Sequence, residues 1–181
     1  MNYADIRAAL LANRQPHDTL VPPAHEGVYA FFLQPRGLLL PIQPGPERVL
    51  YIGMTKDGLD ARNHFEMNSG FSTLRRSLGA ILRRELALRA VPRAPGASKT
   101  NTSNYMFAFD GEEIVSRWMR ANLLASIVPI EGQDIAKLEA QLIADLQPPL
   151  NLTGWPNPQR PLIKKLRARC VQEAGENRVA A

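Results

Sequence analysis

The stretch from Val49 to Phe65, VLYIGMTKDGLDARNHF, constrains the fold of this chain more than any other part. It opens with an apolar run that favours a β-strand, and Gly53 lets the backbone turn without a Cβ penalty. The KDG triplet at 56–58 has turn chemistry, and a helical pattern follows it. A strand, a turn and a helix in this order bring Tyr51 and Arg62 together at the carboxyl end of the strand, with room for a phosphate between them.

Each of these two residues also has an ordinary explanation. A tyrosine on a strand is most often a half-buried packing residue, and an arginine on the first turn of a helix most often faces solvent. Two distant segments strengthen the functional interpretation. EGVYAFFL at 26–33 is a second strand-like run that carries Tyr29. KLEAQLIADLQPPLN at 137–151 is a helix that carries Glu139 and ends at two prolines before Asn151.

Together these parts resemble the GIY-YIG nuclease superfamily. GVY at 27–29 corresponds to its first tripeptide and YIG at 51–53 to its second. Arg62, Glu139 and Asn151 then follow in the order of the family. The resemblance implies an α/β fold with a small, largely antiparallel central sheet flanked by helices, with extra helices at the N- and C-termini.

The resemblance also implies a metal-dependent endonuclease that hydrolyses phosphodiester bonds in a nucleic acid, with DNA as the expected substrate. Glu139 would bind one divalent ion, expected to be Mg²⁺, and Arg62 would steady the scissile phosphate. Tyr29 and Tyr51 would position or deprotonate the attacking water, and Asn151 would orient the site. One carboxylate is enough for such an ion, because Mg²⁺ keeps waters and substrate oxygens as its other ligands. An ion, a guanidinium and a hydroxyl can together stabilise the charge that develops during hydrolysis.

The chain departs from the family pattern at two positions. Many relatives have Lys or Arg directly after YIG, where this chain has Met54, and many have His or Tyr four residues after the arginine, where it has Glu66. We nominate Lys56 as a nucleic-acid contact and His64 as a catalytic residue in their place. His64 follows Arg62 by two residues and therefore points about 200° around an ideal helix from it.

Two other classes of protein fit part of these observations. The main alternative is a nucleic-acid-binding module with the same fold that has lost cleavage, which the departures at Met54 and Glu66 allow. A basic interaction domain unrelated to this family is the third possibility. The intact set of five motif residues argues for the nuclease over both.

The composition suits a nucleic-acid partner. The net charge of +5 and the pI of 9.7 favour a polyanion, although such values also occur in proteins that bind no nucleic acid. The single cysteine, Cys170, excludes an internal disulfide and a cysteine-based zinc site, so we expect a reducing cytoplasm. We expect neither export nor a membrane span, because the N-terminus lacks a signal-peptide core and no stretch approaches about eighteen apolar residues. No oligomeric state is predicted.

Hydrophobic patterns predict the order of elements along the chain. We expect helices at 2–13, 59–67, 73–89, 111–121, 134–146 and 161–174, strands at 27–33, 49–52, 105–109 and 123–130, and a loop at 90–104. The first two strands should form an antiparallel hairpin that brings Tyr29 and Tyr51 near one another. We divide the chain into an N-terminal helix and connector at 1–25, a nuclease domain at 26–152, and a basic helical extension packed on it at 153–181.

Three of the expected helices carry more specific predictions. Asp110 and Glu113 form a capping-box pattern before helix 111–121. In helix 73–89, Arg76 and Arg83 lie two turns apart, a spacing that suits a phosphate backbone, although solvent exposure is the ordinary explanation of each arginine. We therefore predict that Arg75, Arg76 and Arg83 bind nucleic acid. In helix 134–146 the core stripe lies beside Glu139 and consists of Ile135, Leu138, Leu142, Ile143 and Leu146. Beyond the motif, Trp155 is expected to pack against the core rather than to stack on a base.

Overall fold

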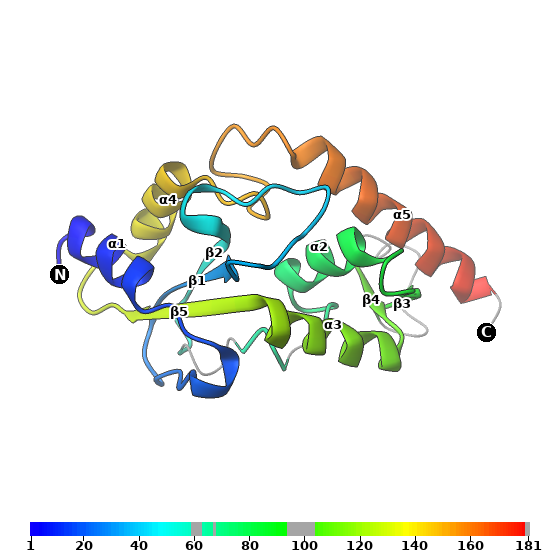
Figure 1. The fold of residues 1–181 in the computed structure, drawn as a ribbon, viewed down its shortest axis with the longest axis horizontal. Coiled ribbons are helices and arrows are strands. Elements are labelled where there is room, and N and C mark those ends of the chain that lie inside the picture. The colour runs from blue at the N-terminus through cyan, green and yellow to red at the C-terminus, as the bar shows by residue number, and fades with distance from the viewer. Residues whose placement is uncertain (59–62, 67, 94–103, 180–181) are drawn as a thin grey trace. The chain divides into compact units, whose positions relative to one another are not determined.

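The computed structural model describes residues 1–58, 63–66, 68–93 and 104–179 (Figure 1). These residues form two compact units, each built from two separate stretches of sequence. The first unit combines Met1–Asn63 with Arg120–Pro158, and the second combines His64–Met119 with Gln159–Ala181. The division at residues 25 and 152 that the sequence suggests stays a prediction.

A three-stranded antiparallel sheet forms the centre of the first unit. Its strands, in spatial order, are β2 (Val49–Thr55), β1 (Gly27–Leu33) and β5 (Leu123–Pro129). All seven residues of β1 are buried, as expected for a central strand that is one apolar run. The predicted hairpin of β1 and β2 is confirmed, and so is the α/β class with a small antiparallel sheet.

Two helices, α1 (Tyr3–Ala12) and α4 (Ile135–Leu146), pack on one face of this sheet. α1 begins at a capping box formed by Asn2 and Asp5. The N-cap of α4 is Asp134, whose side chain accepts a hydrogen bond from the amide of Lys137. All five residues of its predicted core stripe are buried: Ile135, Leu138, Leu142, Ile143 and Leu146. This burial determines which side of α4 faces the sheet.

The second unit is mainly helical. It contains α2 (Thr73–Leu82), the paired strands β3 (Ala90–Pro92) and β4 (Tyr105–Phe107), most of α3 (Phe109–Asn122), and α5 (Arg160–Val179). α5 packs along α2 and β3, as Figure 1 shows. The first unit also has two short 3-10 helices, η1 (His17–Thr19) and η2 (Pro46–Arg48). No helix among the described residues combines the length and the apolar character that a membrane crossing needs.

The predicted helix 73–89 is too long, because α2 ends at Leu82. The chain turns through residues 83–87, and Ala87 has a φ of 52°, which a right-handed helix does not allow. This turn leads into β3, which occupies the start of the predicted loop 90–104. The remainder of that loop at 94–103 and most of the predicted helix 59–67 lie outside the described residues, and residues 64–66 form a turn.

α3 begins at Phe109, two residues before the predicted start. Asp110 is therefore not its N-cap, and its carboxylate accepts a hydrogen bond from the amide of Gly111 instead. Glu112, rather than Glu113, reaches back to the preceding strand and accepts a hydrogen bond from the amide of Phe107 at 2.8 Å. The predicted strand 105–109 accordingly ends at Phe107.

Candidate active site

The two tyrosines predicted as catalytic lie on one face of the sheet. In the register of β1 and β2, Tyr29 is opposite Gly53 and Phe31 is opposite Tyr51. Because side chains alternate along a strand, Tyr29 and Tyr51 are diagonal neighbours on the same face. Their ring centroids are 6.4 Å apart and their planes are tilted by 32°. The prediction that the hairpin brings them together is confirmed.

The ring of Tyr29 lies across Gly53 of the neighbouring strand. A Cβ atom built on Gly53 would come within 2.5 Å of the Tyr29 hydroxyl oxygen and of the ring carbon that bears it. No side chain can occupy this space unless the tyrosine moves. β2 also continues through Gly53 as far as Thr55, so the glycine does not serve the expected turn. The reason for a glycine at this position is steric.

The segment that follows α4 closes the outer edge of β2. The side-chain oxygen of Asn151 accepts a hydrogen bond from the amide of Ile52 at 2.9 Å, and its side-chain nitrogen donates to the Ile52 carbonyl at 2.8 Å. The amide of Leu150 donates to the carbonyl of Leu50 at 2.9 Å. Asn151 thus holds the central residue of the YIG tripeptide by both ends of its amide group.

Glu139 lies half-buried on α4, at the same edge of β2. Burial raises the pKa of its carboxyl group above the usual value, and a hydrogen bond with the backbone of Met54 lowers it. Met54 follows Ile52 by two residues, so Glu139 and Asn151 contact successive outward-facing positions of one strand. The carboxylate and the amide therefore belong to one site.

This site fits one hard divalent cation held by a single protein carboxylate. Glu139 makes no ion pair with another described residue, so no described basic side chain neutralises its partly desolvated charge. Within the described ranges, no three His, Cys, Asp or Glu residues gather as a larger metal cluster. Mg²⁺ suits a site of this kind, because it keeps several waters and binds through one or two carboxylates.

Two residues beyond Asn151 support the turn that carries it. The indole N–H of Trp155 donates to the carbonyls of Pro148 at 3.0 Å and Asn151 at 3.2 Å. The side-chain nitrogen of Asn157, which is 7% exposed, donates to the carbonyls of Pro149 at 2.7 Å and Asn151 at 3.1 Å. The predicted packing of Trp155 against the core is confirmed. Asn157 was not among the predicted site residues, although its place between two prolines signals a polar side chain within a tight crossing.

Three other predicted site residues are not seen beside the tyrosines, Glu139 and Asn151 in the described structure. Arg62 lies outside the described residues. Lys56 is exposed in the turn after β2, and its contact with nucleic acid stays a prediction. His64 belongs to the second unit and is buried, with its Nδ1 atom 2.8 Å from the hydroxyl of Ser72, the N-cap of α2. This contact gives His64 a structural role, so we leave it out of the proposed site.

The structure contradicts the predicted nucleic-acid contact of Arg75. Its guanidinium is fully buried and forms an ion pair with Glu112 at 2.8 Å. It also donates hydrogen bonds to the hydroxyl of Ser116 at 2.9 Å and to the carbonyls of His64 and Phe65. A buried cation needs such partners, and these leave it no access to a phosphate.

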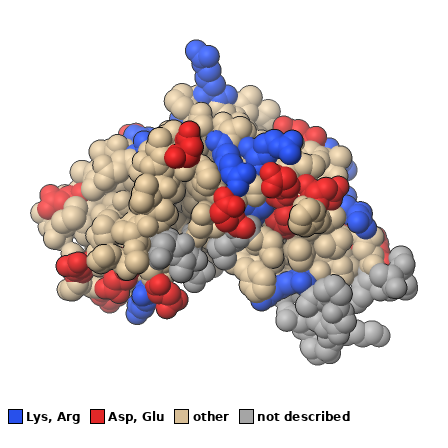
Figure 2. Space-filling model, turned by 90° about the horizontal axis from the view of Figure 1, so that it is seen from below, with Lys and Arg blue, Asp and Glu red and all other residues tan. Residues whose placement is uncertain are grey.

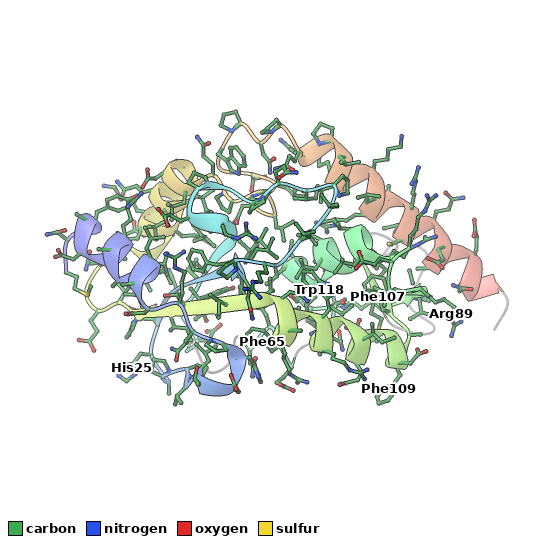
Figure 3. The ribbon with its side chains drawn as sticks, in the orientation of Figure 1. His25, Phe65, Arg89, Phe107, Phe109 and Trp118 are labelled. Carbon is green, nitrogen blue, oxygen red and sulfur yellow. The ribbon has the colours of Figure 1, made fainter. Side chains whose placement is uncertain are left out.

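Arg76 and Arg83 are also not the exposed pair that the helical spacing suggests. Arg76 is 8% exposed and donates to the carbonyls of Ser69 and Gly70, and Arg83 forms an ion pair with Glu173 at 2.8 Å. Eight of the ten residues of α2 are buried, so this helix has little free surface. In this unit the side chain of Phe109, at the start of α3, projects into solvent at 92% exposure (Figure 3).

One comparison with known proteins gives a match. A family model described as the GIY-YIG catalytic domain matches residues 41–170, which is more than half of the chain. The match includes Tyr51, Arg62, Glu139 and Asn151, whereas Tyr29 on β1 precedes it. No curated protein and no solved structure shows a significant match.

Proposed function

The chain belongs to the GIY-YIG family of nucleases, and we propose that it is a metal-dependent endonuclease that hydrolyses phosphodiester bonds in DNA. The observation that carries the proposal is the contact of Tyr29 with Gly53, which sets Tyr29 beside Tyr51. Asn151 and Glu139 contact the same strand at its outer edge. A core built only for stability would gain little from a hydroxyl, an amide and a partly desolvated carboxylate around one strand.

Glu139 would hold the divalent cation through its carboxylate. When bound, the cation would supply positive charge to the phosphate as negative charge develops on it. The carboxylate suits this role, because burial disfavours its charged form and a neighbouring cation would favour it again. The buried core stripe of α4 holds the backbone of Glu139 in place.

Tyr29 and Tyr51 would position or deprotonate the attacking water. A phenol hydroxyl can both donate and accept a hydrogen bond, so two of them can orient one water. Phe31 packs edge-on against Tyr29 with ring centroids 6.1 Å apart, which restrains the orientation of the ring. Arg62 would steady the scissile phosphate through its forked guanidinium, as in the family.

Nicking of supercoiled plasmid DNA tests the proposal directly. The wild-type protein should nick in the presence of Mg²⁺ and not in the presence of EDTA. Glu139→Gln keeps the shape of the side chain and removes its charge, so the nicking rate should fall by about a hundredfold or more, as for loss of one transition-state stabiliser. Glu131→Gln is the matched control, because Glu131 is exposed just before α4 and the same charge is removed there. This control should nick at the wild-type rate.

Binding measured in EDTA separates a nuclease from a binding module. Glu139→Gln should bind DNA as tightly as the wild type or slightly more tightly, because a negative charge near the phosphates is gone. Nicking by this variant at the wild-type rate would rule out Glu139 as the metal ligand. Binding without cleavage of any DNA or RNA substrate by the wild type would favour the module that has lost cleavage.

A further inference from the structure

One stretch of the chain is basic and contains no acidic residue. No Asp or Glu lies between Asp145 and Glu173, and this segment contains five basic residues: Arg160, Lys164, Lys165, Arg167 and Arg169. Its formal charge of +5 equals the net charge of the whole chain. All five basic residues lie in the first half of α5.

These basic residues lie away from the packed side of α5. Ile163, Cys170 and Ala174 are buried and lie on one side of the helix, given about 100° per residue. Four of the five basic side chains are exposed: Arg160, Lys164, Lys165 and Arg169. Arg160 and Lys164, and likewise Lys165 and Arg169, are four residues apart and so about one helical turn apart. The exposed side of α5 thus presents two short rows of positive charge.

α5 is fixed within the second unit by contacts that do not use this basic face. Arg83 forms an ion pair with Glu173 at 2.8 Å, and the side chain of Asn177 donates to the carbonyl of Ala90 at 2.8 Å. Both contacts lie in the C-terminal half of the helix, beyond the basic residues. The face shown in Figure 2 differs, because acidic and basic side chains are interspersed on it.

We propose that the exposed basic face of α5, formed by Arg160, Lys164, Lys165 and Arg169, binds the phosphate backbone of the nucleic-acid substrate. A face with several cations and no acidic residue attracts a polyanion and releases its counterions, whatever the base sequence. The identity of the partner rests on the proposed nuclease function. The binding surface is the α5 face instead of the arginines of α2.

The test is fluorescence anisotropy with a labelled DNA duplex in EDTA, over a salt range of about 50–200 mM. The triple variant Lys164→Gln, Lys165→Gln and Arg169→Gln should bind more weakly than the wild type. Each lost phosphate contact lowers the slope of log K against log salt by about 0.9, so the slope should fall by up to about 2.7. A second triple variant, Lys164→Arg, Lys165→Arg and Arg169→Lys, keeps the charges and should keep the wild-type slope.

A matched control removes three exposed positive charges from elsewhere: Arg36→Gln, Arg117→Gln and Lys137→Gln. It should bind with close to the wild-type slope. Thermal melting should show that both Gln triples are folded, as expected for changes at exposed positions. If both Gln triples lower the slope equally, net charge alone controls binding and the proposal fails.

Two further outcomes would also overturn the proposal. One is a wild-type slope for the α5 Gln triple. The other is unchanged DNA binding by that triple together with lost binding to phosphatidylserine vesicles, which would assign the face to a membrane surface. Because binding is measured in EDTA, the result does not depend on cleavage. A wild type that binds through α5 and never nicks would refute the proposed function and leave this inference standing.

Discussion

The ring of Tyr29 occupies the space that a side chain at position 53 would need. A substitution of Gly53 therefore tests whether the position of this ring matters for activity. Gly53→Ala keeps a β-strand backbone accessible but places a methyl group within 2.5 Å of the tyrosine ring. We expect the ring to be displaced and the nicking rate to fall by about a hundredfold, the effect of about 1 Å of misplacement in an active site. The free energy of unfolding should fall by about 1–3 kcal/mol from overpacking.

A double-mutant cycle with Tyr29→Ala checks this explanation. Once the ring is absent, Gly53→Ala should cost much less stability, so the two losses should not add. Additive losses, or wild-type nicking by Gly53→Ala, would show that the contact does not matter.

The raised pKa of Glu139 predicts a pH-dependent effect on stability. A carboxyl group whose pKa is higher in the folded state than in the unfolded state favours folding below its unfolded pKa, and this advantage is lost as pH rises through the folded pKa. In EDTA, Glu139→Gln should therefore melt at a higher temperature than the wild type at about pH 8, and the difference should shrink towards about pH 4.

Added Mg²⁺ provides the second part of this measurement. At about pH 8 it should raise the melting temperature of the wild type more than that of Glu139→Gln, because only the carboxylate binds it well. Equal shifts for the two proteins would place the ion elsewhere. Glu131→Gln should behave like the wild type throughout.

Single residues differ in how far the sequence predicts them. Tyr29 and Tyr51 lie side by side on neighbouring strands, as the predicted hairpin indicates, and Asn151 contacts the outer edge of β2. Arg75 does not face solvent, because its burial depends on Glu112, which lies 37 residues away on another helix. Local periodicity contains no information about such a partner.

At the scale of elements, α2 and β4 pack closely because one residue of the helix lacks a side chain. A Cβ atom on Gly79 would come within 2.1 Å of the Phe107 ring. Gly79→Ala should therefore lower the free energy of unfolding by about 1–3 kcal/mol, although alanine favours a helix by about 1 kcal/mol over glycine.

Gly175→Ala on α5 is the control for this prediction. A Cβ at Gly175 would meet no atom within 4 Å, so only the gain in helix propensity remains, up to about 1 kcal/mol. Chemical denaturation of both variants gives the two values. A stabilised Gly79→Ala would show that Phe107 moves aside at little cost.

Elements with a strong period were predictable, and elements defined by distant contacts were not. β1, β5 and α4 have long apolar patterns, and their positions agree closely with the predictions. β3 has only three residues, and it is a strand because it pairs with β4, which follows more than ten residues later in the chain. The turn between α2 and β3 includes the positive φ of Ala87, a residue type that gives no signal of a turn.

At the scale of the whole molecule, the sequence reveals the distribution of charge but not the way in which segments group into compact units. The net charge was visible in the composition, and the basic stretch of α5 is visible in the sequence once the helix is known. The make-up of the two units cannot be read from the sequence, because each unit joins stretches that are far apart in the chain. Contacts such as that of Asn177 with Ala90 decide which stretches pack together.

The position of β2 at the edge of its sheet has a further consequence. An outer strand offers unpaired backbone groups to which a strand of another molecule can add, which is a common route to aggregation. Here Leu150, Asn151 and Glu139 occupy those groups along β2. The residues assigned to chemistry thus also protect the protein from self-association, so the loss of Asn151 would reduce solubility as well as activity.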